Sequence, residues 1–271
     1  MRYFEVLVEG RSQAVSQEQA FEILRTKCSS ALTATPIFRG VGKSSEHHMW
    51  VEPQNFSRKS ANTQNYHTLL VDNMASWSAF PKRSQSIICT TDMMKAARYG
   101  GLGGQGVYRV LPINGSTIGV CSDDDWWDSF SQFERFGVNV ASFNDDLEEV
   151  FIAFFNDVPA SGPANWKIFE DWITKVDEQI QKAKRVKRSS GSDWADDFRG
   201  APGYLINNDG MSFTDTLRTL LEPIVNGFKL ANINNFQTQN KVEVWTDGPS
   251  LLIANSVYDD FIAAYLDGIE I

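Results

Sequence analysis

Residues 81–112 constrain the fold of this chain more than any other stretch. Residues 86–89 form a short apolar run with β-branched side chains, a pattern typical of a buried strand. The polar side chains that follow directly are Thr90, Thr91 and Asp92. Asp92 can cap a helix, which we expect over residues 93–99, and a second strand follows from Val107. These elements form one compact unit, and its hydroxyl groups lie at a strand end, where a ligand can reach them.

The composition indicates a globular protein of one elaborated domain or two modest ones. The chain has 271 residues, of which 42% are hydrophobic and 12% aromatic, so it can bury a sizeable core. Strand patterns occur early in the chain and return late, in residues 241–245 and 250–253, while the middle is mostly helical. We therefore predict an α+β fold in which the late strands complete a sheet that the early strands begin.

The predicted domain organisation follows from this distribution. Residues 1–122 are expected to form the first part of the α+β core, and residues 238–271 its C-terminal strands. Residues 123–237 between them are expected to form a helical insertion or cap, in which residues 145–155 and 166–186 show the clearest helical pattern.

Local patterns predict further elements of the core. Ser16 is typical of a helix start, and the apolar spacing after it predicts a helix to about residue 32. Residues 41–66 are polar and irregular, so we expect a loop over a site, followed by a helix over residues 66–77. Asn114-Gly115 predicts a tight hairpin turn between the strands on either side of it.

Charge and cysteine content limit the partners and the compartment. A formal net charge of −9 and a pI near 4.9 argue against a broad surface for nucleic acid or anionic membrane. The three cysteines, Cys28, Cys89 and Cys121, are widely spaced among apolar residues, which predicts reduced core thiols. The first residues are too short and too charged for a signal peptide, and no apolar run approaches the ~18 residues of a membrane span. We expect a cytoplasmic protein with no membrane partner.

A local basic cluster stands apart from this acidic average. Residues 182–188 contain five lysines and arginines, followed by a Ser- and Gly-rich stretch at residues 189–192. A solvated helix end next to a flexible linker accounts for such a run. Binding of RNA or of an acidic partner is the other interpretation.

Two further patterns do not predict sites. His47, His48 and His67 lack the i, i+4 spacing that places two ligands on one helical face, so we predict no metal site. Residues 101–106 match GxGxxG, but they follow a helix and precede a strand, the reverse of the order in a phosphate-binding turn. We expect a loop there.

Three short motifs carry chemistry that suits a dinucleotide. Arg39 lies in Phe38-Arg39-Gly40, Thr90 begins the polar group after the buried strand, and Glu243 lies in Val242-Glu243-Val244-Trp245. The planar donor fork of arginine matches oxyanions and diols, and hydroxyl groups can position other side chains. A glutamate can stabilise positive charge while a glycosidic bond breaks.

These motifs, in the order Arg, Thr, Glu, resemble those of the arginine-type Arg-Ser-Glu group of the ADP-ribosyltransferase superfamily. The sequence also resembles uncharacterised bacteriophage-encoded members of this kind, and the resemblance covers residues 30–121 and 238–255. It implies a split β-sheet core with NAD as co-substrate. The implied activity is mono-ADP-ribosyl transfer to a protein or nucleic-acid acceptor, with release of nicotinamide, in the host cytoplasm. The residues implied to be catalytic are Glu243, Arg39 and Thr90, and those implied to bind NAD are Arg39, Gly40, Thr90, Thr91 and Asp92.

The sequence departs from the family's pattern at two positions. Asp92 stands where the Ser-Thr-Ser motif ends in serine, and Lys241 stands where the family carries Glu or Gln. Taken alone, Asp92 is also a common helix cap, and Glu243 also fits the solvent face of an ordinary strand. The alternative function is therefore a non-catalytic phage structural or host-interaction protein that retains the fold.

Overall fold

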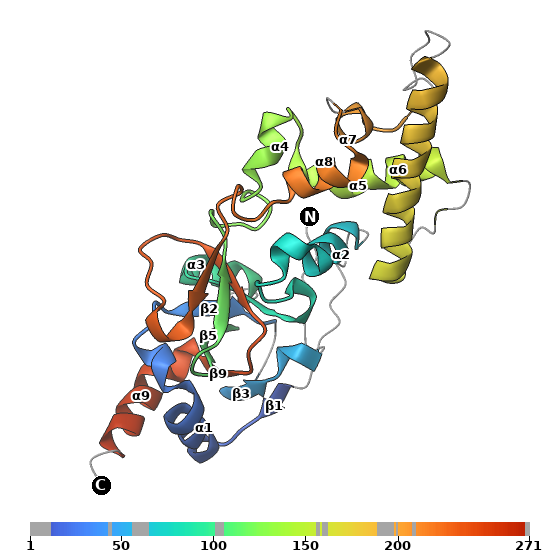
Figure 1. The fold of residues 1–271 in the computed structure, drawn as a ribbon. Helices are drawn as coiled ribbons and strands as arrows, with labels where there is room; N and C mark the ends of the chain where they lie inside the picture. The colour runs from blue at the N-terminus through green and yellow to red at the C-terminus, as the bar shows by residue number, and fades with distance from the viewer. Residues whose placement is uncertain are drawn as a thin grey trace. The chain divides into compact units, whose positions relative to one another are not determined.

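A computed structural model describes residues 12–42, 45–55, 65–100, 106–155, 158, 162–188, 198, 200–207 and 210–268. The predicted α+β class is confirmed, because helices accompany one nine-stranded antiparallel sheet in this part of the chain (Figure 1). The strands are β1 (Ser12–Ala14), β2 (Ile37–Gly40), β3 (His48–Val51), β4 (Ile87–Thr90), β5 (Val107–Pro112), β6 (Thr117–Val120), β7 (Lys229–Asn232), β8 (Glu243–Thr246) and β9 (Ser250–Ala254). The α-helices are α1 (Gln17–Ile23), α2 (Tyr66–Asn73), α3 (Met93–Tyr99), α4 (Ser131–Arg135), α5 (Phe143–Phe154), α6 (Trp166–Arg188), α7 (Gly203–Ile206), α8 (Phe213–Leu220) and α9 (Tyr258–Asp267).

The chain divides into two compact units. The first unit comprises residues 1–61, 79–129 and 227–271 and contains all the strands named above. The second unit comprises residues 62–78 and 130–226. The sequence pattern predicts an insertion at residues 123–237, whereas the contacts assign residues 123–129 and 227–237 to the first unit. They also assign residues 62–78 to the second unit.

The sheet has the strand order β1-β3-β9-β5-β2-β4-β8-β6-β7. The two late strands lie inside it, since β8 pairs with β4 and β6, and β9 pairs with β3 and β5. This confirms the prediction that late strands complete the sheet begun by early ones.

The helical segment after Ser16 is confirmed. Ser16 caps α1 through a capping box, in which its hydroxyl accepts from the backbone of Gln19 and the Gln19 side chain accepts from the Ser16 backbone. Shorter helical turns, η1 (Leu24–Cys28) and η2 (Ser29–Leu32), continue α1. Phe21 of α1 contacts the ring of Phe261 in α9, and Figure 1 shows these two helices side by side. The buried residues of this segment join the core of the first unit.

The predicted hairpin around Asn114-Gly115 is wrong. The turn exists, with Gly115 at φ 81°, a conformation that favours glycine. The strands on either side do not pair with each other, because β2, β4 and β8 lie between β5 and β6. The turn is held by other segments: the Asn114 backbone donates to the Lys27 carbonyl, and the Gly115 backbone donates to the Asn234 side chain.

The predicted loop over residues 41–66 contains a strand. β3 pairs with β1 and β9 across residues 48–51, where Met49 and Val51 are buried. The local sequence does not predict this strand, because its alternation is short: only Met49 and Val51 form the buried face, and His48 and Trp50 form the other. Residues 56–64 lie outside the described part of the chain, as do residues 101–105 of the glycine-rich loop and residues 189–192.

The second unit is helical in the part that the structure describes. The predicted long helices are present as α5 and α6, and aromatic side chains fill the space between them: Phe151 contacts the rings of Tyr66, Phe169 and Phe213. Among the described residues, no helix has the length and apolar character needed to cross a bilayer.

Candidate active site

The three strands that carry the sequence motifs are consecutive neighbours in the sheet. Thr90 of β4 lies directly opposite Glu243 of β8 and opposite Phe38 of β2. Residues that face each other on antiparallel strands project from the same face of a sheet. Thr90 and Glu243 therefore share one face, with Phe38 in the same row.

The sheet is weakly joined at this place. β2 and β4 share a single register pair, Phe38 with Thr90, whereas β2 with β5 and β4 with β8 each pair over four residues. Few ladder pairs leave the two strands free to separate on either side of Thr90. The seam between β2 and β4 is thus the point where the sheet is least continuous among these strands.

Arg39 lies at the seam, one residue out of step with the row of Thr90 and Glu243. Side chains alternate along a strand, so Arg39 does not share their face. Its Nη1 instead donates across the seam to the backbone carbonyl of Ile88, at 2.7 Å. Burial lowers the pKa of Arg39, while Cys89 and the charge of Glu243 act in the opposite direction. The guanidinium is therefore a half-buried cation within the electrostatic reach of Glu243.

Gly40 has a packing role. A Cβ atom at this position would lie 2.2 Å from the carbonyl oxygen of Ala96 and 2.6 Å from the backbone nitrogen of Gly100. Helix α3 therefore packs directly on the backbone of β2, and only glycine leaves room for it.

The polar side chains at the end of β4, Thr90 and Thr91, are engaged in local hydrogen bonds. The Thr90 hydroxyl accepts from the Asp92 backbone at 3.1 Å, and Thr90 is 6% exposed. The Thr91 hydroxyl donates to the Asn240 carbonyl and accepts from the Val242 backbone, both at 2.9 Å. Thr91 thus fastens the end of β4 to the segment that leads into β8.

Asp92 caps α3 and also contacts Lys241. The Asp92 side chain accepts from the Met94 backbone at 3.0 Å. Its other oxygen lies 3.0 Å from Nζ of Lys241. The hydrogen bond from Lys241 is the main reason why the pKa of Asp92 is lowered.

Glu243 is held by an arginine that the sequence analysis did not identify. Nη2 of Arg83 lies 2.6 Å from Oε1 of Glu243, and the two side chains are only 18% and 13% exposed. The Arg83 guanidinium stacks on Trp126, 3.9 Å from the ring centroid, and lies 5.9 Å from the ring of Trp245. In the described part of the chain, Oε2 of Glu243 has no hydrogen bond, so one oxygen is fixed and the other is left to accept.

The signal for Arg83 in the sequence was weak. It lies in a short helical turn, η5 (Arg83–Gln85), just before β4, and nothing in its neighbourhood predicts a partner 160 residues away. Trp126 follows three aspartates, and two of them, Asp124 and Asp125, pair with Lys95 of α3.

Cys28, Cys89 and Cys121 are buried, as predicted, and none of the three forms a disulfide within the described part of the chain. Burial raises the pKa of Cys28 to about 12 and holds that of Cys121 well above its usual value. The thiols of Cys28 and Cys121 are therefore poor nucleophiles in the folded protein. Among the described residues, no three His, Cys, Asp or Glu side chains come together as a group that could hold a metal ion.

Comparison of the chain with protein-family models, with curated proteins and with solved structures finds no match.

Proposed function

We propose that this protein is an NAD-dependent mono-ADP-ribosyltransferase with a split-sheet core, which transfers ADP-ribose to a protein or nucleic-acid acceptor and releases nicotinamide. The observation that carries the proposal is the seam between β2 and β4. The Arg, Thr and Glu motifs are separated by up to 204 positions in the sequence, yet they lie on three consecutive strands around this seam.

The chemistry assigns a role to each charged side chain. The C1′–N bond to nicotinamide breaks and its electron pair stays on the departing nitrogen, which leaves positive charge on the ribose. Oε2 of Glu243 is the acceptor that stabilises this charge, and Arg83 fixes the carboxylate through Oε1. Arg39 projects from the other face of the sheet, so in this proposal the donors that Ile88 does not use reach the diphosphate through the seam between β2 and β4. An acceptor nucleophile then attacks C1′, and its proton passes to solvent water.

Replacing Glu243 by Gln tests this role. The Glu243→Gln protein should still bind NAD by calorimetry, while transfer and nicotinamide release in the presence of host lysate fall at least ~100-fold. Glu149→Gln, an exposed carboxylate of α5, is the matched control and should keep full activity. Undiminished activity of Glu243→Gln would remove Glu243 from the mechanism.

Arg39 is tested through binding. Arg39→Ala should weaken NAD binding itself, because it removes the cation proposed to anchor the diphosphate. The melting temperature of the Arg39→Ala protein is measured as well, because the variant also loses the hydrogen bond to the Ile88 carbonyl. Unchanged NAD affinity in a folded Arg39→Ala protein would contradict the assignment.

A second function is favoured by a specific observation. Two ion pairs, Arg83 with Glu243 and Asp92 with Lys241, neutralise charges that a transferase would use, and the Thr90 and Thr91 hydroxyls are engaged by the backbone. This is the arrangement expected of a non-catalytic phage structural or host-interaction protein that retains the fold. If the wild-type protein neither binds NAD nor labels any lysate component, this second function replaces the first.

A further inference from the structure

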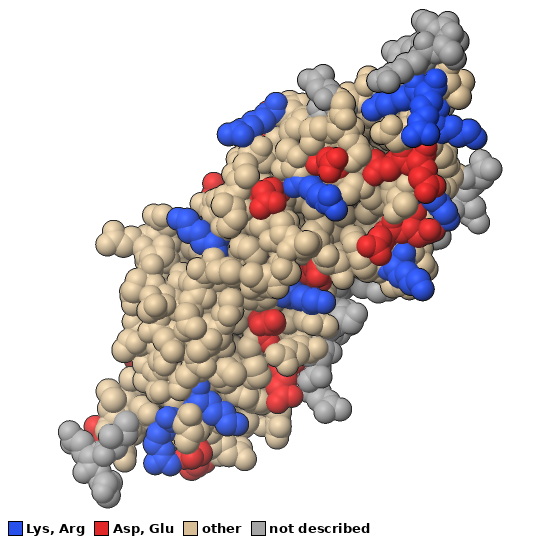
Figure 2. Space-filling model, viewed as in Figure 1, with Lys and Arg blue, Asp and Glu red and all other residues tan. Residues whose placement is uncertain are grey.

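Helix α6 divides into an acidic part and a basic part. Its first thirteen residues, 166–178, include the acidic side chains Glu170, Asp171, Asp177 and Glu178, whereas residues 179–188 contain no acidic residue and five basic ones. Figure 2 shows blue side chains gathered at one end of this helix and red ones beside its other part. A chain with a net charge of −9 thus has a concentrated positive surface at one helix end.

This basic end extends past the packed part of the helix. The inward stripe of α6 is formed by Phe169, Ile173, Val176 and Ile180, which are at most 6% exposed. After Ile180 the apolar burial stops, and Val186 is 58% exposed. The exposed cations Lys182 and Arg185 therefore do not cover a core.

The charges of Lys182 and Arg185 are not neutralised within the described part of the chain. Both side chains are exposed and neither forms an ion pair there, in contrast to Lys175, which pairs with Asp171 at 2.6 Å. The helix dipole accounts for a cation in the last turn, such as Arg185, but not for Lys182, which lies six residues before the end of α6.

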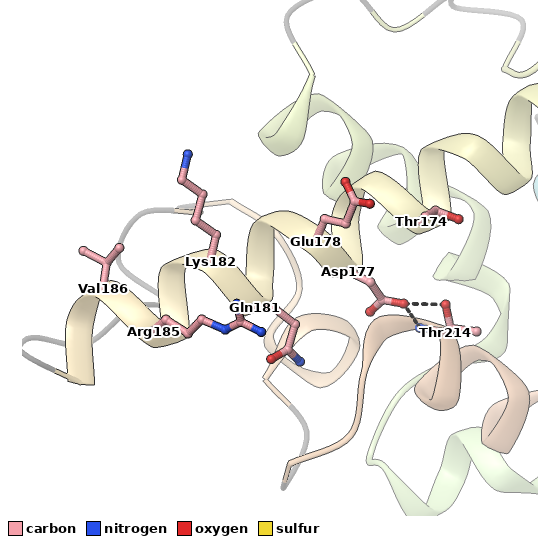
Figure 3. A pocket seen from close by; sticks show the side chains of 8 residues that line it. All are labelled: Thr174, Asp177, Glu178, Gln181, Lys182, Arg185, Val186 and Thr214. Carbon is pink, nitrogen blue, oxygen red and sulfur yellow. Dashed lines mark hydrogen bonds between the residues drawn. The ribbon is translucent and has the colours of Figure 1, made fainter.

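A groove of about 650 Å³ adjoins these cations (Figure 3). Its lining residues are Thr174, Asp177, Glu178, Gln181, Lys182, Arg185, Val186 and Thr214. Asp177 is already occupied, since its carboxylate accepts from the backbones of Phe213 and Thr214 and from the Thr214 hydroxyl. Figure 3 shows the Gln181 amide and the Arg185 guanidinium on one side of the helix, with Lys182 projecting from its other side. Glu178 is the opposing charge, and the volume of the groove lies in the usual range for ligand sites.

We propose that the basic end of α6, where Lys182 and Arg185 are exposed, binds the sugar-phosphate backbone of a nucleic acid, with one nucleotide lying over the groove. Protein interfaces bury a core from which lysine is depleted and in which aromatic side chains are enriched. Among its described side chains, this surface presents Lys182 and Arg185 and no aromatic residue, so it suits phosphates better than a protein face. The acidic remainder of the molecule confines a polyanion to this end.

The test measures binding of the full-length protein to fluorescent RNA and duplex DNA by anisotropy at several salt concentrations. Wild-type protein should bind with an affinity that falls steeply with salt. Lys182→Gln with Arg185→Gln should weaken binding and reduce the slope of log K against log salt by about 2, one for each cation removed. Glu178→Gln, which removes the opposing charge in the groove, should tighten binding.

The control is Lys167→Gln with Lys175→Gln, which makes the same charge change in the acidic part of α6 and should leave the slope unchanged. Absence of binding at low salt overturns the proposal, as does an equal loss in the control variant. Poly-glutamate that displaces the RNA as well as unlabelled RNA does would identify an acidic protein partner instead. None of these outcomes depends on NAD, so the proposal stands or falls independently of the proposed transferase activity.

Discussion

Glu243 and Arg83 form a contact that sequence order does not reveal. Their side chains are largely buried, and the stacking of the guanidinium on Trp126 fixes its position. Removing one partner of such a pair leaves the other charge without compensation, which costs more than the pair itself contributes. Arg83 is therefore a positioning residue for the carboxylate, whether or not the site turns over a substrate.

A double-mutant cycle measures this coupling. Arg83→Ala should lower the free energy of unfolding by about 2–4 kcal/mol, because it leaves Glu243 unpaired and removes the packing on Trp126. The double variant with Glu243→Ala should lose less than the sum of the single variants, with a coupling energy of about 1–3 kcal/mol from urea denaturation.

The exposed pair of Arg25 and Glu22 is the matched control. Its side chains are 65% and 56% exposed, so its coupling energy should stay below ~1 kcal/mol. Equal coupling in the two pairs would show that burial does not strengthen the contact of Arg83 with Glu243.

The sequence predicts the strands and turns that carry the candidate residues. It does not predict which other side chains these residues contact. Glu243 was predicted in a strand and Thr90 directly after one, and both lie at strand ends opposite each other. The pairing of Asp92 with Lys241 was not predicted, because charge complementarity between distant positions has no local pattern. The same holds for Arg83, which no periodicity distinguishes from a surface arginine.

At the scale of elements, α3 depends on the residue that precedes it. Asp92 caps the helix and pairs with Lys241, and this pair lowers the pKa of Asp92. A carboxylate with a lowered pKa stabilises the folded state above the pKa of unfolded aspartate, about 3.9. That contribution is lost as the pH falls through the lower pKa of the folded state.

Asp92→Asn separates the charge from the cap, because asparagine caps helices as well as aspartate does. At neutral pH the variant should be less stable than wild type by at most about 1 kcal/mol, since Lys241 is 69% exposed. The difference should shrink as the pH falls below the pKa of unfolded aspartate, about 3.9, as acid denaturation followed by circular dichroism would show. Lys241→Gln should reproduce this profile. A Lys241→Gln protein with the wild-type profile would separate the pKa of Asp92 from the ion pair.

Elements are more predictable from this sequence than their neighbours in the sheet. β5 and β6 were both expected, and a turn does form at Asn114-Gly115, with Gly115 at positive φ. The turn residues nevertheless bond to Lys27 and Asn234 rather than closing a hairpin. Alternation of apolar residues determines which face of a strand is buried. The pairing of β5 with β2 and β9 depends on contacts between distant segments, which local patterns do not contain.

At the scale of the whole molecule, each of the two units has buried residues of its own. Ile253 is 0% exposed in the core of the first unit, and Ile180 is 1% exposed in α6 of the second. Chains that divide into compact units commonly unfold in more than one step. We therefore expect two thermal transitions in calorimetry of the intact chain.

Matched substitutions assign each transition to a unit. Ile253→Val and Ile180→Val each remove one buried methylene, at a cost of about 0.5–1.5 kcal/mol, which shifts a transition by about 2–6 °C. Ile253→Val should move one transition and Ile180→Val the other, because the methylene is lost from a different core in each case. A single transition that both variants shift equally would show that the two units unfold together, and the helical unit would then have to be treated as part of one cooperative domain with the sheet.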